Sequence, residues 1–264
     1  MENEESILTK PVQFLLILNV NSQKKSDMVQ TKAKIFLAED RGLNETAWFR
    51  SFNTFNYGQY QQEHKQPFGK MYVLNDDALD GGRSMTMQVE EQSSIILLPV
   101  FGALRFKTSA GHEGTLAAGQ VQLLMLDKGD HLELINPFKE ELINFLQIWI
   151  RHDLPAGTVS VSSDFDVNVF QNSLLKISPQ WLGDHRLPFS ISIGKFSGRG
   201  EAAFYPSTPD AGVFMLVLDG AFEVAGRLLH AGDGLALYET SPIDIEALSY
   251  EALILVVEQP VLPV

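Results

Sequence analysis

The sequence predicts an all-β protein of two mostly antiparallel barrels or sandwiches, with few or no long helices. Residues 81–150 consist of short apolar runs separated by Gly, Pro, Asn and Asp, with almost no helical periodicity, a rhythm typical of small β-domains. The same order of apolar strands and glycine turns recurs later in the chain. The 264 residues are 45% hydrophobic and 20% charged, an ordinary globular composition with room for two such domains.

Charge and cysteine content exclude several classes of protein. A net charge of -13 and the lack of a basic run argue against a nucleic-acid partner, because phosphates are held by Lys and Arg. The chain has no cysteine, which excludes disulfides, thiolate zinc sites and a cysteine nucleophile. The apolar run at 12–20 is shorter than the roughly 20 residues that span a bilayer, and its acidic leader does not resemble a signal peptide. We therefore expect a cytoplasmic protein without a membrane partner.

Residues 1–32 stand apart from the rest as an N-terminal extension or an extra edge strand. One hypothesis is that Met28 is the natural start, because every recognisable feature follows it. The alternative is an additional strand at Gln13–Val20, since short apolar runs do not settle their own structure. The mass of the native N-terminus would distinguish a chain that begins at Met1 from one that begins at Met28.

The first domain is predicted to span residues 33–152. It begins with a strand at Lys34–Leu37 and continues into the aromatic segment Trp48–Tyr57, whose alternation suggests a half-buried strand or extended arm. A further run follows at Met71–Asp77. Its last two residues, Asp76 and Asp77, could serve as general acid and base, but the A-L-D-G-G that follows favours a turn there.

The remaining elements of this domain are short strands around one hairpin. They are expected at Ser84–Glu90, at Ile95–Phe106 with a turn near Gly102, and at Leu116–Leu126, His131–Ile135 and Asn144–Arg151. Residues 153–190 change character, with Pro, Gly and a run of Ser, Asp and Asn, and we interpret them as a connection with short strands.

The C-terminal domain, residues 191–264, repeats the first one. Its Phe214–Val224 matches Leu97–Phe106, and its Leu229–Leu237 matches Leu116–Leu124. Both copies contain an apolar strand, a Gly-Ala hairpin and a Leu-x-Ala-Gly turn. We expect positive φ at the hairpin glycines, Gly102 and Gly220, and at the turn glycines, Gly119 and Gly232.

Six segments in order resemble the pirin family of bicupins, two-barrel members of the cupin superfamily. They are W-F-R-S-F-N-T-F (48–55), F-G-K-M-Y-V-L-N-D-D (68–77), G-A-L-R-F-K-T-S-A-G (102–111), G-Q-V-Q (119–122), I-N-P (135–137) and Q-I-W-I (147–150). Each segment is weak alone, but their order and spacing are specific. The resemblance covers residues 33–150 well and the second barrel in outline, and it implies two cupin-type β-barrels.

The resemblance also implies an iron-type metal in the first barrel, held by a His-x-His pair and a His-x-Glu pair. Such spacing directs both members of each pair to one face of a strand. Counted from Gly102, the first pair falls on Gln88 and Glu90; counted from Gly119, the second falls on Leu132 and Leu134. Another family histidine, in the aromatic segment, is Asn53 here.

A His-x-Glu does occur one residue earlier, at His131 and Glu133, which a slip of one residue would turn to the opposite face. A bulge near Lys128–Asp130 could turn this pair inward again. The candidate ligand-binding group is therefore Gln88, Glu90, His131 and Glu133, either as a rebuilt site for a divalent transition metal or as polar residues beside an apolar cavity with the leucines inside.

We predict no bound metal or other cofactor, because this group lacks the three imidazoles that hold divalent iron, and we assign no catalytic residue. The other histidines lack partners at ligand spacing and are predicted to lie at the surface or in turns; they are His64, His112, His152, His185 and His230. The tryptophans, Trp48, Trp149 and Trp181, are predicted to pack in cores or between the barrels.

Three functions follow from the resemblance. The first is a non-catalytic bicupin that binds a small apolar or aromatic ligand in the N-terminal barrel, or a protein partner. The second is a metal-dependent dioxygenase of the quercetin 2,3-dioxygenase type, with the rebuilt site and with Glu90 or Glu133 as base. The third is a partner of transcription regulators, which the acidic surface permits but does not select.

Overall fold

The computed structural model describes residues 32–58, 60–154, 157–179, 181–182, 185–208, 210–238 and 242–261. Both hypotheses about the N-terminal extension, the Met28 start and the strand at Gln13–Val20, lie outside these residues. The described chain is almost entirely antiparallel β-structure, with one 3₁₀ turn, η1 (Ala38–Asp40). None of its helical segments has the length and apolar character that crossing a bilayer requires.

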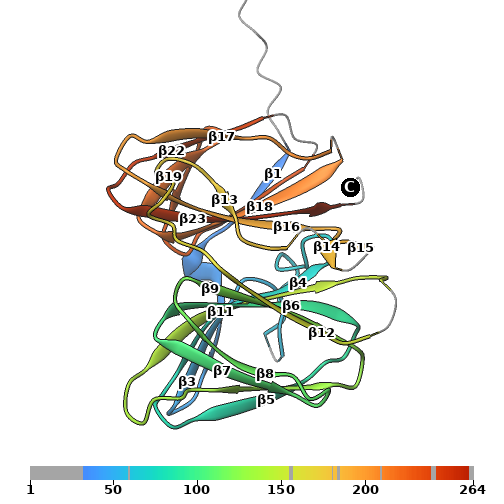
Figure 1. The fold of residues 1–264 in the computed structure, drawn as a ribbon. Helices are drawn as coiled ribbons and strands as arrows, with labels where there is room; N and C mark the ends of the chain where they lie inside the picture. Colours follow the sequence, from blue (N-terminus) through green and yellow to red (C-terminus); the bar gives the residue numbers. More distant parts are fainter. Residues whose placement is uncertain are drawn as a thin grey trace, which may run out of the picture. The chain divides into compact units, whose positions relative to one another are not determined.

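The N-terminal half consists of two antiparallel sheets that enclose a common core (Figure 1). The larger sheet has the order β12 (Val159–Asp164), β9 (Gln120–Leu126), β6 (Ser93–Phe101), β11 (Ile143–Arg151), β4 (Met71–Leu79), β3 (Phe49–Asn53) and β2 (Gly42–Glu45). The smaller sheet has the order β5 (Ser84–Gln88), β10 (His131–Ile135), β7 (Ala103–Thr108) and β8 (Glu113–Ala117). Alternate residues of each strand fill the space between the sheets.

The C-terminal half has the same two-sheet plan. Its larger sheet has the order β1 (Ala33–Phe36), β21 (Gly234–Leu237), β18 (Ala211–Asp219), β23 (Ala252–Pro260), β16 (Ser190–Phe196) and β13 (Leu175–Lys176). Its smaller sheet has the order β17 (Glu201–Phe204), β22 (Ile243–Ala247), β19 (Ala221–Val224) and β20 (Arg227–His230). The short strands β14 (Trp181–Leu182) and β15 (His185–Arg186) pair separately. The all-β, two-domain architecture is thus confirmed, with paired sheets as the form that each barrel takes.

The repeat extends to the register of the strands. In each half a long strand crosses to the small sheet through a glycine, Gly102 with φ 81° and Gly220 with φ 78°. Beside each of these glycines the adjoining ladder shifts register, at Asn144/Phe145 in the first half and between Val217 and Asp219 in the second. The turn glycines Gly119 and Gly232 have φ of 88° and 85°. All four predicted positive φ angles are therefore confirmed.

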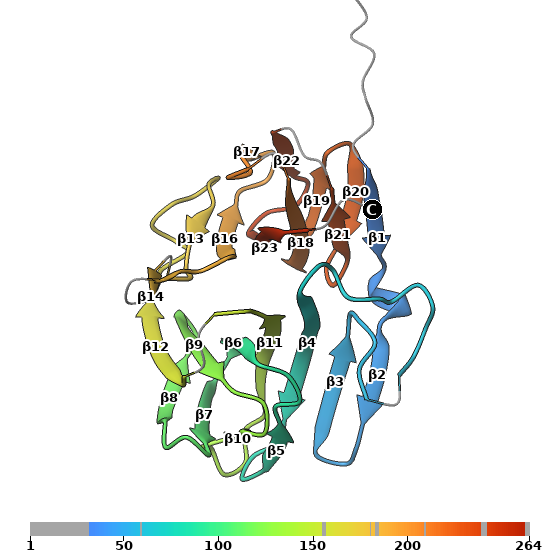
Figure 2. The ribbon, with the colours of Figure 1, turned by 90° about the vertical axis from the view of Figure 1, so that its right-hand side faces the viewer.

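Two strands cross the domain boundaries drawn from the sequence. The strand expected at Lys34–Leu37 forms as β1, but it pairs with β21 of the C-terminal half (Figure 2). Conversely, β12 lies within the predicted connection, yet it pairs with β9 of the N-terminal half. Each strand covers an edge of a large sheet that would otherwise present unpaired backbone groups.

Two sequence predictions need correction. The strand expected at Leu116–Leu126 is divided by a turn at Gly119 into β8 and β9, whereas the turn expected at Gly232 does separate β20 from β21. The turn expected at Asp76 and Asp77 is instead the middle of β4. Neighbours on both sides, β3 and β11, provide backbone partners there, so the ladder prevails over the local turn signal.

A third apolar cluster joins the two halves. Its members come from the outward faces of both large sheets and include Leu74, Leu146, Ile191 and Leu255. The fully buried ring of Phe214 lies at its centre, with the rings of Phe36, Phe55 and Phe68 at centroid distances of 5.5, 5.6 and 5.6 Å. Packing between the halves is therefore apolar, with a group of aromatic rings around Phe214.

Candidate ligand site in the N-terminal half

The four residues expected to bind a ligand do not converge inside the N-terminal half. His131 of β10 lies opposite Gln88 of β5, and both side chains are exposed. Glu133 is half-buried on the same outer face of β10, and Glu90 is exposed beyond the end of β5. The register between β5 and β10 runs without a shift from His131 to Ile135, so the bulge near Lys128–Asp130 does not turn this pair inward.

Leucines occupy the inward positions of β10. Leu132 and Leu134 have no exposed surface and pack in the core with the partly buried Met85 and Met87 of β5. The side chains at these positions offer no metal donor, so the residues present do not fit the histidine and glutamate centre that the family resemblance implies. Throughout the described residues, no three His, Asp or Glu side chains gather closely enough to hold a metal ion.

Polar side chains instead gather on the opposite wall of the same core. They are Ser51 and Asn53 of β3, Asn75 and Asp77 of β4, and Gln147 of β11, each at most 3% exposed. Cross-strand pairing forms two rows: Asn53, Asn75 and Gln147 lie side by side, and Ser51 lies beside Asp77. We call these five residues the inner polar cluster. Alternation along β3 and β4 places them on the same face as the core residues Val73 and Trp149.

Hydrogen bonds fix most of the inner polar cluster. The indole Nε1 of Trp149 donates to Oε1 of Gln147 over 3.1 Å, and Nε2 of Gln147 in turn donates to Oδ2 of Asp77. Nδ2 of Asn53 donates to Oγ of Ser51 over 2.8 Å. The amide and carboxyl groups are therefore held in set orientations by the barrel wall.

Among the described residues, three oxygens of the cluster have no hydrogen-bond donor: Oδ1 of Asn53, Oδ1 of Asn75 and Oδ1 of Asp77. A buried acceptor without a partner costs about 1–3 kcal/mol, so three neighbouring ones call for an explanation. All three belong to adjoining positions of β3 and β4. A group that meets them has to donate hydrogen bonds, as a hydroxyl or an amine does.

Burial changes the protonation of two groups in this region. Desolvation raises the pKa of Asp77 to about 7, against the hydrogen bond from Gln147 that favours the carboxylate. Burial, followed by the charge of Asp77, raises the pKa of Tyr57 to about 12. The Tyr57 hydroxyl donates to Sδ of Met87 at 3.6 Å. Near neutral pH the site therefore holds a neutral phenol beside a carboxyl close to its own pKa.

The sequence points to two residues of this cluster: Asn53 stands where the family has a histidine, and Asp77 is a possible acid or base in a segment predicted to be a turn. The usable signal was a shared spacing, because Ser51 and Asn53, and likewise Asn75 and Asp77, are two residues apart in runs otherwise rich in apolar residues. Such spacing indicates a polar stripe on one face of a strand.

One histidine prediction needs correction, because His152 does not lie at the surface. It follows the end of β11 and is only 4% exposed, and its Nδ1 accepts from the backbone N–H of Leu154 at 3.2 Å. Burial lowers its pKa, so the neutral ring is favoured. His64 and His230 are exposed and His112 is half-buried, which agrees with the prediction for these three; the side chain of His185 lies outside the described ones.

Two of the tryptophan predictions can be compared with the structure. Trp149 is buried in the core of the N-terminal half, and Trp48 packs partly buried against the same core. The core-packing prediction is thus confirmed for both of these residues. The side chain of Trp181 lies outside the described ones.

Comparison with known proteins agrees with the fold of both halves. Residues 37–150 match the Pirin family, and residues 189–258 match the quercetinase C-terminal cupin domain. Quercetin 2,3-dioxygenase of Escherichia coli K12 is 23% identical over 212 residues, which cover 80% of this chain and 91% of that protein. A pirin-like protein of Caulobacter vibrioides is 24% identical over 220 residues, which cover 81% of this chain and 94% of that protein.

A solved structure extends the likeness to the whole fold. The bacterial pirin YhhW of Escherichia coli, in complex with nickel(II), superimposes with a TM-score of 0.76 at 19% sequence identity, over 88% of this chain and 100% of that one. At this identity the structural similarity shows the fold alone, and the two family matches show the family to which each half is related. The chain is a pirin-like cupin protein composed of two cupin domains.

Proposed function

We propose that this protein is a non-catalytic, metal-independent member of its family that binds a small aromatic molecule bearing hydroxyl groups in its N-terminal half. The observation that carries the proposal is the placement of polar and apolar side chains in the core of the N-terminal half. Leu132 and Leu134 occupy the inward positions where the family resemblance places metal ligands, while the inner polar cluster directs unpartnered acceptors from the facing wall.

The chemistry of the wall supports a phenolic ligand. Hydroxyl groups on a rigid ring would donate to Asn53, Asn75 and Asp77, and they would remove the cost of leaving those oxygens unpaired. Aromatic side chains that pack against this core, among them Trp149 and Tyr57, suit the faces of such a ring. Relatives bear the name quercetin 2,3-dioxygenase, and quercetin is a polyhydroxylated aromatic molecule of this class, so it is the first ligand to test.

The decisive experiment measures metal content and oxygen uptake together. Protein purified without chelators is analysed for iron, nickel, copper, manganese and zinc, and oxygen consumption is then followed with quercetin after loading each metal in turn. We expect substoichiometric metal and no oxygen uptake. A stoichiometric metal together with consumption of oxygen would support the dioxygenase alternative with the site of Gln88, Glu90, His131 and Glu133.

Paired variants separate the two sites. Asn53→Leu removes an inward acceptor, and it should weaken quercetin binding about tenfold, which corresponds to roughly 1.4 kcal/mol and to one lost hydrogen bond. His131→Gln changes an exposed side chain on the outer face of β10, and it should leave binding unchanged. Quenching of tryptophan fluorescence reports both affinities. Loss of binding in His131→Gln but not in Asn53→Leu would reverse the assignment.

A protein partner, including a transcription regulator, remains a prediction from the family resemblance. The acidic composition permits such a contact without specifying its chemistry. Retrieval of one stoichiometric partner from a native lysate by the wild-type chain would give it support, whereas retrieval of chaperones alone would weaken it.

A further inference from the structure

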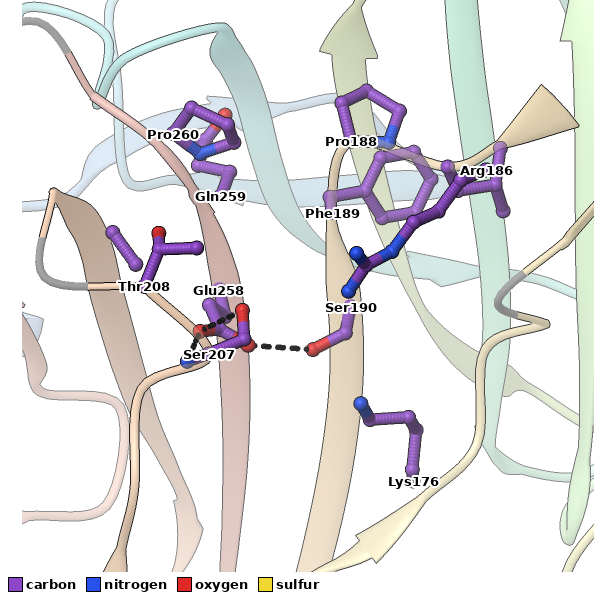
Figure 3. Close-up of a pocket in the computed structure, with 12 residues that line it drawn as sticks. Lys176, Arg186, Pro188, Phe189, Ser190, Ser207, Thr208, Glu258, Gln259 and Pro260 are labelled. Atoms are coloured by element: carbon purple, nitrogen blue, oxygen red, sulfur yellow. Dashed lines mark hydrogen bonds between the residues drawn. The ribbon is translucent and has the colours of Figure 1, made fainter.

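A pocket in the C-terminal half combines fixed acceptors with two cations that form no ion pair with any described residue (Figure 3). Its volume is about 240 Å³, and it lies where β16 and β23 run beside the segment before β18. The residues that the argument uses are Lys176, Arg186, Ser190, Ser207 and Glu258. We propose that this pocket binds a small carboxylate that also carries a hydroxyl group, independently of the ligand proposed for the N-terminal half.

The acceptor side of the pocket is a buried carboxylate. Glu258 lies opposite Ser190 across the β16–β23 ladder and is only 5% exposed. Its Oε1 accepts from the backbone N–H of Ser207 and, at 2.7 Å, from the Ser207 hydroxyl; its Oε2 accepts from the Ser190 hydroxyl at 3.2 Å. Both hydroxyl protons are thereby committed to Glu258, so the two serine oxygens present lone pairs to the pocket. A ligand group that faces this side therefore has to donate hydrogen bonds.

The opposite side of the pocket is cationic. The side chains of Lys176 and Arg186 extend toward the space in front of Ser190 (Figure 3). In the described part of the chain neither forms an ion pair within 4.0 Å, although other lysines and arginines of this acidic protein do, such as Lys70 with Asp153 and Arg199 with Glu246. Among the described residues that line the pocket, two cations face one carboxylate, which gives this set an excess positive charge.

The positions of the charged and polar side chains determine how the groups of a ligand would lie in the pocket. A planar carboxylate fits the fork of the Arg186 guanidinium with Lys176 as a second point charge. The hydroxyl of the ligand then donates toward Glu258 and the serines. Pro188 and Phe189 beside β16, and Pro260 across from them on β23, line the pocket with apolar groups that suit a short carbon chain. Malate contains this arrangement, whereas succinate has the same carboxylates without the hydroxyl.

The test compares these two probes on the full-length chain by isothermal titration calorimetry. Wild-type protein should bind L-malate at least fivefold more tightly than succinate. Arg186→Gln changes an exposed side chain and should weaken both probes about tenfold, while Glu258→Gln should remove the preference for malate. Lys107→Gln, a change on β7 of the other half, should leave both affinities unchanged.

Several outcomes would overturn the proposal. Equal affinities for malate and succinate in the wild type would show that the hydroxyl group of the ligand donates no hydrogen bond in this pocket. Unchanged binding in Arg186→Gln would remove the cationic side, and inorganic phosphate binding as tightly as malate would reduce the pocket to a general oxyanion site. If Glu258→Gln fails to fold, Ser207→Ala takes its place in the test. This variant removes the hydroxyl that donates to Oε1 of Glu258, so it frees a lone pair of the carboxylate without removing its charge, and the ratio of malate affinity to succinate affinity should rise. An unchanged ratio would refute the role of Glu258.

Discussion

Asp77 is the residue at which burial and charge oppose each other most directly. Its carboxyl group is 1% exposed, and desolvation raises its pKa from an ordinary value of 3.8 to about 7. A carboxyl with a raised pKa binds more protons in the folded than in the unfolded state between these two values. Its contribution therefore stabilises the fold most below about pH 4, and it is lost progressively as the pH rises toward 7.

The Asp77→Asn variant tests this linkage. At pH 8 the variant removes a buried negative charge, and it should raise the free energy of unfolding by as much as about 4 kcal/mol, at roughly 1.4 kcal/mol per pKa unit. The gain should shrink as the pH falls from 7 toward 4, where the wild-type carboxyl is protonated in the fold. Urea denaturation at pH 5 and pH 8 measures the difference. Glu133→Gln on the outer face is the matched control, and an equal gain for Asp77→Asn at both pH values would contradict the account.

For single residues, the sequence alone does not determine which side chains point into the core. Whether His131 or Leu132 points inward depends on a register of one residue, and only the pairing of β10 with β5 and β7 fixes that register. Asp77 follows the same rule, because its burial requires β3 and β11 on either side of β4. The sequence shows which residue types stand at these positions, but it does not show which face of the sheet each side chain occupies.

At the scale of elements, the glycine turns at which each long strand passes from the large to the small sheet were the most predictable feature, although the strands on either side of each turn do not pair as the hairpin that the sequence predicts. Their glycines repeat at matching positions, because a side chain disfavours the left-handed backbone that the turn needs. The partner of β1 was not predictable. A four-residue strand pairs with whichever edge the chain places beside it, and here that edge belongs to the other half.

The Gly220→Ala variant should destabilise the C-terminal half. At φ 78° an L-residue costs about 1–2 kcal/mol, and a Cβ at Gly220 would also lie 2.2 Å from Oγ of Ser249. Gly226→Ala is the control, since it has φ 72° with no atom within 4 Å of the added Cβ. Thermal unfolding should therefore show a larger loss for Gly220→Ala than for Gly226→Ala. Equal losses would mean that backbone strain alone accounts for both.

At the scale of the molecule, an apolar interface unites two copies of one fold. The general plan was predictable from the repeated strand order, whereas the interface was not, because its residues lie on the outer faces of the large sheets. Outward-facing apolar residues in an alternating strand make sense only once a second sheet covers them. Phe36 shows this well, because it lies on β1 yet packs against Phe55 of the N-terminal half and Phe214 of the C-terminal half.

Phe214→Ala probes this interface. Removing the ring deletes contacts with Phe36, Phe55 and Phe68 at once, and a buried Phe→Ala change typically costs about 3–5 kcal/mol. Tyr205→Ala is the control, because that ring is 71% exposed. Chemical denaturation should show one strongly shifted transition for Phe214→Ala and almost none for Tyr205→Ala. A loss under 1 kcal/mol for Phe214→Ala would show that the interface contributes little.

The central claim is that the N-terminal half binds through the inner polar cluster rather than through a metal. The most direct test is the affinity for quercetin measured by tryptophan fluorescence in matched samples with and without a strong chelator. We predict one affinity in both samples. Binding that disappears with the chelator and returns on addition of a divalent transition metal would contradict the claim.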